Sequence, residues 1–310
     1  MRLSVKALML LLLSAAMVAT AQPAAQSSDE VQVVVTALGR HGTPPPPVPR
    51  DTVTVFQERE RRAVVSWEPL RSGPPMNLAV VIDETVGSGF GIQLDNLSNF
   101  IRALPPNVRV AVIYARNGNA TVAQTFTSNH AAAAKALRLP LGSPGAVDSP
   151  YLALLDLLQR WPEGDNPGQV LLVSHGIDLF RGVSSSAAGV NPDLQRAIET
   201  ALRHGIVVNT LYASGRAPIH RNRFLVSNGQ SALARLAAET GGEAFFQGFD
   251  TPVSFQPFLE RLAGNFGQQY LLTFRVQPAA KAGYQRLRVD AEVAGVELVA
   301  PARVYVPAAR

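Results

Sequence analysis

The stretch Asn77-Leu-Ala-Val-Val-Ile-Asp83-Glu-Thr85-Val-Gly87-Ser88-Gly89 joins an apolar run to an acidic, hydroxyl-bearing, glycine-rich turn. The run does not alternate between apolar and polar residues, which is typical of a parallel strand that helices cover on both faces. Open sheets of parallel strands bind ligands beyond the carboxyl ends of the strands. The turn that begins at Asp83 is therefore a candidate ligand or metal site.

Strands and helices alternate on both sides of this stretch. Further strands are predicted at 108–115, 170–174 and 206–212, with 121–126 as a partner of the first. Helices are predicted at 92–104, 130–139, 151–161, 192–204, 231–240 and 257–265. This alternation predicts an α/β fold with a mostly parallel sheet, right-handed crossovers and helices on both faces.

Segments of β character flank the α/β unit. They lie at 31–37, 52–58 and 62–68 before it, and at 270–276, 285–293 and 297–306 after it. Each flank alone is barely enough for a stable sheet, so we expect the two to pair into one small β-sandwich. The predicted organisation is 22–74 and 266–310 for the sandwich and 75–265 for the α/β domain.

The first 21 residues have the order of a secretory signal peptide. Arg2 and Lys6 precede an apolar run at 7–18, and Ala19-Thr20-Ala21 follows it. The run is shorter than the roughly 20 residues of a membrane-spanning helix. We expect cleavage after Ala21 and a mature protein that is secreted or periplasmic, with no membrane span; a retained amino-terminal anchor is the alternative.

Composition narrows the classes of protein further. The chain has no cysteine, so its stability does not depend on disulfides. Its formal net charge is +5, of which Arg2 and Lys6 supply two. The remainder is too small and too evenly spread to indicate binding to nucleic acid. The best candidate for contact with an acidic partner is the loop that carries Arg216, His220, Arg221 and Arg223.

Four segments, in this order and spacing, resemble the von Willebrand factor type A (VWA) family, and more closely the secreted VWFA-related proteins that are abundant in acidobacteria. They are Leu78-Ala-Val-Val-Ile-Asp83, Asp148-Ser149-Pro-Tyr-Leu-Ala-Leu-Leu, Val170-Leu-Leu-Val-Ser-His175-Gly176-Ile-Asp178 and Leu233-Ala-Arg-Leu-Ala-Ala-Glu-Thr-Gly241-Gly242-Glu-Ala-Phe-Phe246. Gln269-Tyr270-Leu-Leu-Thr-Phe274 is similar to the Q-Y-L-L-x-Y sequence that follows the domain in these proteins. The resemblance implies a Rossmann-like VWA domain.

The resemblance also implies a metal-ion-dependent adhesion site, which holds a divalent cation, usually magnesium, with D-x-S-x-S, a threonine and an aspartate. Asp83 matches the first ligand, Thr85 the first hydroxyl and Ser149 the threonine of the second loop. Hydroxyl and carboxylate oxygens suit such a hard ion, which leaves one position open for a carboxylate of a partner.

Two positions depart from that pattern. Gly87 stands where the second serine belongs, and Ser88 could replace it only if the turn were rearranged. His175 stands where the aspartate is expected. Imidazole is a poor ligand for magnesium and a good one for zinc, copper or nickel. Losing one anion and one hydroxyl should weaken magnesium binding severely, so the sequence predicts a degenerate site.

Three functions remain open. The leading hypothesis is a secreted, non-enzymatic protein that contacts a protein partner through the loops at the carboxyl edge of its sheet. Those loops carry Asp83, Thr85, Gly87, Ser88, Ser149 and His175. The alternatives are a divalent-metal-dependent adhesin with a rearranged ion site, and a hydrolase that uses Ser149 and His175. Adjacent residues of a strand face opposite ways, so His175 should not serve Ser174, and no G-x-S-x-G elbow surrounds Ser149.

Overall fold

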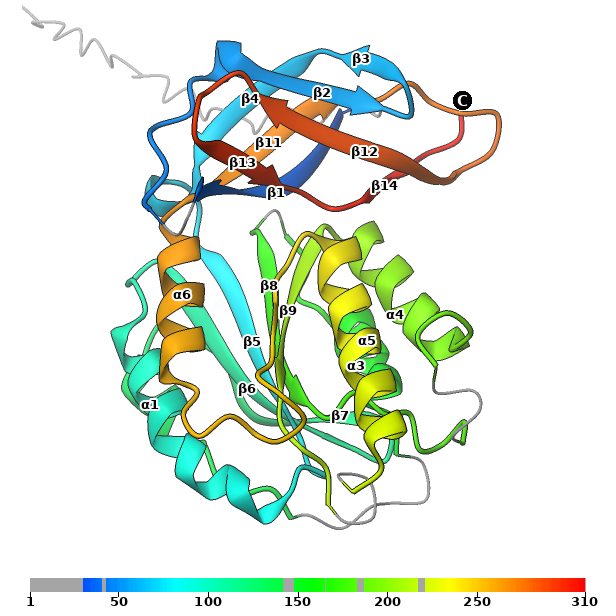
Figure 1. The fold of residues 1–310 in the computed structure, drawn as a ribbon. Coiled ribbons are helices and arrows are strands. Elements are labelled where there is room, and N and C mark those ends of the chain that lie inside the picture. Colours follow the sequence, from blue (N-terminus) through cyan, green and yellow to red (C-terminus); the bar gives the residue numbers. More distant parts are fainter. Residues whose placement is uncertain are drawn as a thin grey trace, which may run out of the picture.

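A computed structural model of the chain describes residues 30–40, 43–141, 148–164, 166–182, 187–216 and 221–309. The predicted signal peptide and His220 lie outside the described residues. Within these ranges, no helix has the length and apolar character needed to cross a membrane. The elements form two stacked parts, an α/β unit and a β-sandwich that lies over one end of its sheet (Figure 1).

The α/β unit is built on a six-stranded sheet with the order β10-β9-β8-β5-β6-β7. Its strands are β5 (Met76–Asp83), β6 (Val108–Arg116), β7 (Asn119–Thr127), β8 (Gly168–Ser174), β9 (Ile206–Tyr212) and β10 (Ala244–Phe245). All neighbours are parallel except β7, which returns antiparallel to β6 at one edge. Every residue of β5, β8 and β9 is buried, as their mostly apolar sequences predict.

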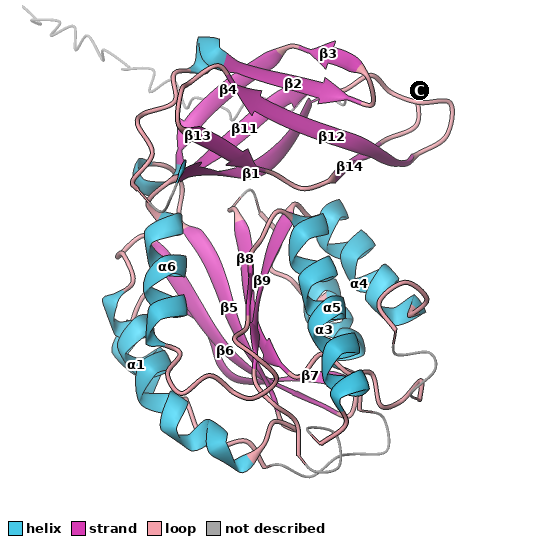
Figure 2. Ribbon diagram, in the orientation of Figure 1, coloured by secondary structure: helices cyan, strands magenta, loops and turns pink. Residues whose placement is uncertain are grey.

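Helices cover both faces of this sheet (Figure 2). They are α1 (Leu94–Ala103), α2 (His130–Lys135), α3 (Pro150–Gln159), α4 (Pro192–Arg203), α5 (Arg223–Thr240) and α6 (Gln256–Phe266), with the short 3₁₀ helices η2 (Arg50–Thr52), η3 (Leu70–Ser72) and η4 (Ser88–Gln93). One face packs on α3, α4 and α5, and the other on α1, α2 and α6. The predicted α/β class is confirmed.

The flanking segments pair into two four-stranded sheets, as expected. Their strands are β1 (Glu30–Gly39), β2 (Val53–Gln57), β3 (Glu60–Arg62), β4 (Val64–Pro69), β11 (Gln269–Arg275), β12 (Gly283–Ala291), β13 (Val296–Val299) and β14 (Arg303–Val306). The sheet orders are β13-β1-β11-β4 and β14-β12-β2-β3, so each sheet mixes strands from both flanks. Trp67 stacks on Tyr270 at 4.3 Å between ring centroids, which ties a strand of one flank to a strand of the other.

Three predicted elements differ in the structure. The helix expected from Ser231 begins at Arg223, because the side chain of Asn222 accepts hydrogen bonds from the N–H groups of Phe224 and Leu225 and so caps it earlier. The helix expected from Ile92 begins at Leu94, and Ile92 lies in η4 and is 75% exposed. The segment 297–306 is two strands in two sheets, interrupted at 300–302.

A buried amide cluster joins the two parts. The side chain of Gln169, near the amino end of β8, donates to Gln269 Oε1 at 2.5 Å. Gln269 donates to Thr36 Oγ1 at 3.2 Å, and Asn209 donates to Gln169 Oε1 at 3.3 Å. All four side chains are buried. Since buried amides are costly without partners, these bonds fix the sandwich on the amino end of the parallel sheet.

Candidate functional site

The carboxylate of Asp83 lies at the carboxyl end of β5 and is the centre of a closed hydrogen-bond cluster. Its Oδ1 accepts from the backbone N–H of Thr85 at 2.9 Å and from the Thr85 hydroxyl at 2.5 Å. Its Oδ2 accepts from the hydroxyl of Ser174 at 2.6 Å. Ser174 in turn accepts from the N–H of Gly176 at 2.9 Å. Three donors therefore compensate one buried carboxylate.

The two ring nitrogens of His175 have fixed roles. The backbone N–H of Ile177 donates to Nδ1 at 3.0 Å, so Nδ1 carries no proton. Nε2 lies 2.8 Å from the hydroxyl oxygen of Thr85, whose own proton goes to Asp83. Nε2 must therefore be the N–H donor in this pair. The imidazole presents a proton, and not a lone pair, to the cluster.

A close glycine contact sets the position of His175. Gly176 has φ +74°, and a Cβ on it would lie 2.4 Å from the carbonyl oxygen of Gly229 in α5. A Cβ on Gly229 would lie 2.1 Å from the carbonyl oxygen of His175. The hydroxyl of Tyr151 donates to the Gly176 carbonyl at 2.6 Å, and burial raises the pKa of Tyr151 well above its ordinary value. The turn after β8 is thus held between α3 and α5.

Gly87 has a packing reason of its own. Its N–H donates to the carbonyl oxygen of Ser214 at 2.8 Å, and Val86 forms a β-bridge with Gly215. A Cβ on Gly87 would lie 3.3 Å from the Ser214 oxygen and 3.4 Å from that of Gly215. A serine here would therefore push on the backbone of the segment after β9. The glycine at this position of the metal-site pattern is therefore explained by the close approach of the two loops.

Ser149 belongs to a neighbouring cluster around Asp178. Its hydroxyl caps α3 by accepting from the N–H of Leu152 at 3.3 Å, and it donates to Asp178. Asp178 also accepts from Asn191 Nδ2 at 3.1 Å and from the N–H of Arg181 at 3.2 Å. Burial raises the pKa of Asp178, while these hydrogen bonds work in the opposite direction. No hydrogen bond joins Ser149 to His175 within the described residues.

A second buried acid anchors the next loop. Glu84 is buried beside Asp83, accepts from the Arg138 guanidinium, and also accepts from the N–H of Leu141. Arg138 lies over the ring of Tyr114 at 3.8 Å from its centroid, and its backbone exchanges two hydrogen bonds with the Tyr114 hydroxyl. This arrangement explains why α2 ends at Lys135 and does not continue to Leu139: the segment is drawn to the sheet edge.

The residues present do not fit a magnesium ion. The cavity beside Asp83, Thr85, Ser149 and His175 measures about 10 Å³, which is room for at most one water molecule. Magnesium needs six oxygen ligands at about 2.0–2.1 Å, whereas the imidazole directs an N–H at this point. Among the described residues, no group of three or more His, Cys, Asp or Glu side chains is placed to hold a metal ion.

The structure brings most of the predicted site residues together. Asp83, Thr85 and His175 form one cluster, Gly87 lies in the adjoining turn, and Ser149 lines the same cavity from the Asp178 cluster. The side chain of Ser88 lies outside what the structure describes. Sequence reasoning named Ser174, Asp178 and Asp148 but did not place them in this site, although Asp148 also lines the cavity. The signal for Ser174 was available: it is the last residue of a strand that ends beside β5.

The geometry does not assemble a Ser-His-Asp triad. His175 uses both ring nitrogens elsewhere, and the hydroxyl of Ser149 donates to Asp178. The expectation that His175 does not serve Ser174 holds, because the Ser174 hydroxyl donates to Asp83. A general base needs a free lone pair within reach of the nucleophile. This arrangement supplies none to either serine.

Fold and site together define an α/β protein whose mostly parallel sheet carries a closed carboxylate cluster at its carboxyl edge and a β-sandwich at the other. No protein-family model and no curated protein matches the sequence. Solved structures that the chain resembles include VWA domain proteins. One is a von Willebrand factor type A structure from Catenulispora acidiphila, with 12% identity over 93% of this chain and 75% of that one, at a TM-score of 0.45.

Two further likenesses are of the same order. An aerotolerance-related membrane protein from Bacteroides fragilis shows 11% identity over 62% of this chain and 98% of its own, with a TM-score of 0.43. The pilus adhesin SpaC from Lactobacillus rhamnosus GG shows 10% identity over 83% of this chain and 47% of its own, with a TM-score of 0.45. These identities and TM-scores describe a likeness in fold.

Proposed function

We propose that this chain is a secreted, non-enzymatic protein of the VWA type that binds a protein partner through the loops at the carboxyl edge of its sheet, without a bound metal ion. The observation that carries the proposal is the closed cluster at Asp83. Its acceptors are already satisfied and His175 presents a proton. The cluster is therefore a scaffold for the surrounding loops, and these loops supply the contacts.

The loops at this edge expose apolar side chains. Of the ten large hydrophobic residues that are exposed in the described ranges, all but Val122 lie here. They are Ile92, Leu139, Leu141, Phe180, Val190, Phe224, Phe246, Phe249 and Val253. Val253 is 93% exposed and Val190 is 67% exposed. Apolar side chains gathered at one end of a molecule are typical of an interaction surface.

At the same edge the buried charges are mostly acidic and the exposed ones mostly basic. Asp83, Glu84, Asp178 and Asp193 are buried, whereas the exposed charges are Arg116, Arg216, Arg221 and Arg223, with the two acids Asp95 and Asp250. Arg223 lies over Phe249 at 5.7 Å from the ring centroid. A surface of arginine and phenylalanine favours a partner with acidic and apolar side chains.

The test is chemical cross-linking of the mature protein in the envelope and culture medium of its host, followed by identification of the captured protein. Two charge-introducing double variants are compared, Val190→Glu/Phe224→Glu at the edge and Val122→Glu/Arg102→Glu away from it. We expect the edge variant alone to lose capture, since the substituted residues are exposed and should leave the fold intact. Equal capture by both variants would refute the proposed surface.

Two further arms separate the alternatives. If a chelator abolishes capture and magnesium restores it, the protein is a metal-dependent adhesin with a rearranged site. Calorimetric titration with magnesium and manganese tests the ion site directly. We expect no tight binding by the natural protein; tight binding that Asp83→Ala abolishes would establish the metal-dependent alternative. A hydrolase would be established if the natural protein turned over a substrate and Ser149→Ala or His175→Ala abolished that turnover while the protein stayed folded.

A further inference from the structure

The loop between β10 and α6 exposes three apolar side chains at the carboxyl edge. It covers residues 246–255 and contains no helix or strand. Phe246, Phe249 and Val253 are all exposed, Val253 most of all. A loop of this kind usually has a mobile backbone, which leaves its exposed side chains without a fixed position. Here, buried side chains of the α/β unit bind the backbone of the loop at several residues.

Two buried side chains hold the first half of the loop. Gln230 in α5 donates to the carbonyl oxygen of Gly248 at 2.6 Å. The hydroxyl of Tyr212, at the end of β9, donates to the carbonyl oxygen of Phe249 at 3.2 Å. Burial, with the carboxylate of Asp250 nearby, raises the pKa of Tyr212 to about 12, so the hydroxyl keeps its proton at neutral pH. The backbone at 248 and 249 is therefore fixed to two different elements.

The second half of the loop depends on Gln93, which is buried in η4. Its Nε2 donates to the carbonyl oxygens of Pro252 and Val253, at 3.1 and 3.0 Å. Its Oε1 accepts from the N–H of Phe255 at 2.8 Å. All three of these bonds go to the loop. Since a buried amide is costly without partners, the loop cannot move away from Gln93 without a loss of stability.

A fixed backbone that carries exposed apolar side chains suits binding. Phe249 and Val253 contribute little to the core, because both are exposed, yet their backbone positions are held. Fixing a loop before it binds reduces the entropy that binding must remove, and so strengthens binding. Charges of both signs flank Phe249, because Arg223 lies over its ring and Asp250 follows it in the chain. The apolar side chains therefore carry the contact.

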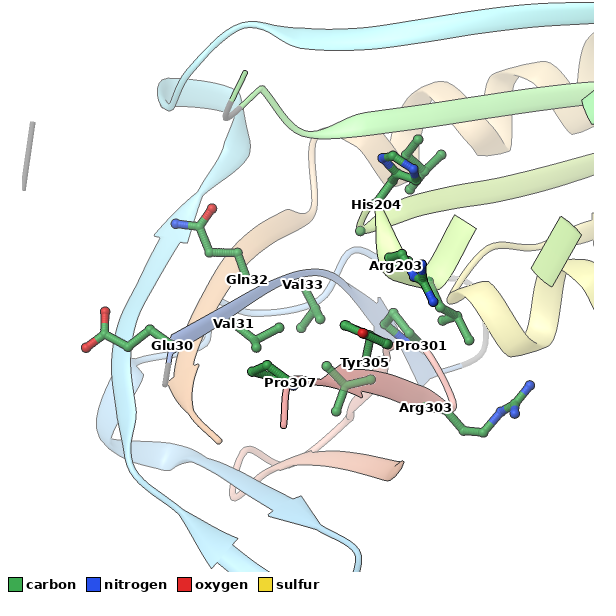
Figure 3. A pocket seen from close by; sticks show the side chains of 14 residues that line it. Glu30, Val31, Gln32, Val33, Arg203, His204, Pro301, Arg303, Tyr305 and Pro307 are labelled. Atoms are coloured by element: carbon green, nitrogen blue, oxygen red, sulfur yellow. The ribbon is translucent and has the colours of Figure 1, made fainter. Parts of the chain in front are cut away.

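A second place where a partner could bind is a cavity of about 350 Å³ at the junction of the two parts. Figure 3 shows Arg203, Arg303 and Tyr305 among the side chains around it. Its arginines already have partners, because Arg303 pairs with Glu239 and Arg203 hydrogen-bonds with Tyr284. Among the described residues, none of the exposed large apolar side chains lines this cavity. The loop at the carboxyl edge is therefore the stronger candidate.

We propose that the loop at 246–255 is a preformed binding element that inserts Phe249 and Val253 into an apolar pocket of a partner protein. The inference rests on the proposed function, since it names the part of that surface on which affinity depends. Gln93 and Gln230 are positioning residues, because both are buried and act on the partner only through the loop.

Backbone relaxation measured by nuclear magnetic resonance tests the loop in the isolated protein. We expect order parameters of about 0.85 for the N–H groups at 248–253, the value of a rigid backbone. Gln93→Leu keeps the exposed side chains but removes the hydrogen bond to Val253, so the value there should fall below about 0.6. Gln269→Leu, which removes a buried glutamine at the opposite end of the molecule, should leave the loop unchanged.

Site-specific photo-crosslinking tests the contact in the host. A benzophenone amino acid replaces Val253, Phe249 or Val122, one at a time, in the full chain. We expect the first two positions to attach to apolar segments of one and the same protein, and position 122 to attach to none. Gln93→Leu should lower the yield from position 253 about tenfold, because the loop is no longer preformed, whereas Gln269→Leu should not. Support requires both the attachment and its loss in Gln93→Leu.

The inference and the proposed function fail in different ways. The double variant Val253→Glu/Phe249→Glu should abolish capture of the partner. If it still captures the partner while Val190→Glu/Phe224→Glu does not, the loop is not the anchor and the proposed function stands. If the natural chain captures no protein from any position of the edge, both are wrong.

Three further results would overturn the inference. They are a mobile loop in the free natural protein, equal attachment from position 253 in Gln93→Leu and in the natural protein, and loss of attachment in Gln32→Glu, which lines the junction cavity. The last result would move the partner to the junction. If Gln93→Leu does not fold, Gln230→Leu makes the same test, because it frees the loop at Gly248.

Discussion

The two ends of β8 carry two buried polar clusters of opposite character. At the amino end, Gln169 shares its amide with Gln269 of the sandwich and Asn209 of β9. At the carboxyl end, Ser174 contributes to a cluster that closes on the single carboxylate of Asp83. The first cluster crosses from one part of the molecule to the other, and the second turns inward beneath exposed loops. Neutral amides join the two parts, whereas a compensated charge supports a surface.

The largest effect should come from a second acid at the carboxyl end. His175→Asp restores the residue type that the metal-site pattern expects, but it places two carboxylates side by side in a buried cluster. We expect a loss of roughly 3–5 kcal/mol of stability at neutral pH, which shrinks at acidic pH as one carboxylate gains a proton. Thermal unfolding across pH measures it, with the uncharged His175→Asn as control.

The same variant sharpens the question of the ion. Magnesium should raise the melting temperature of His175→Asp, because a cation would compensate the added charge, and should leave that of the natural protein unchanged. A matching rise in the natural protein would show that its cluster opens to admit the metal. In the double variant His175→Asp/Gly87→Ser, magnesium should raise the melting temperature further only if the backbone at Ser214 moves away from the new side chain.

A smaller loss is expected when the turn after β8 is displaced. Gly229→Ala puts a methyl group 2.1 Å from the His175 carbonyl oxygen, and the helix α5 must move to relieve it. We expect a cost of about 3 kcal/mol from denaturant unfolding. Gly264→Ala in α6, where an added Cβ meets nothing within 4 Å, should instead stabilise by about 0.5–1 kcal/mol. Similar losses in both would mean that the contact with His175 is not the cause.

Much of this could be predicted from the sequence. Mostly apolar runs identified β5, β8 and β9, and the order of elements predicted the parallel sheet and the sandwich. Asp83, Thr85 and His175 were expected to meet, and they do. The tautomer of His175 could not be foreseen, because it depends on one backbone N–H from Ile177. The amide cluster could not be predicted either, because its members are far apart in the chain and belong to no motif.

The amino end of β8 should respond less strongly. Gln269→Leu leaves Gln169 without one partner in a buried position and should cost roughly 1–2 kcal/mol. It should also speed hydrogen exchange in β1 and β11 more than in β5, because the junction loosens before the parallel sheet does. Gln256→Leu, at an exposed position of α6, is the matched control. Uniform acceleration in both parts would show that the cluster does not act at the junction.

The smallest effect concerns His204, which lies at the same end of the molecule as the amide cluster. Partial burial and the charge of Arg203 hold its pKa below the ordinary value of 6.5. Arg203→Gln removes the repulsion of the imidazolium, so the pKa should rise; burial persists, so it should stay below 6.5. Nuclear magnetic resonance titration of the imidazole measures the shift, and Arg196→Gln should not produce it. A pKa that Arg203→Gln leaves unchanged would show that burial alone lowers it.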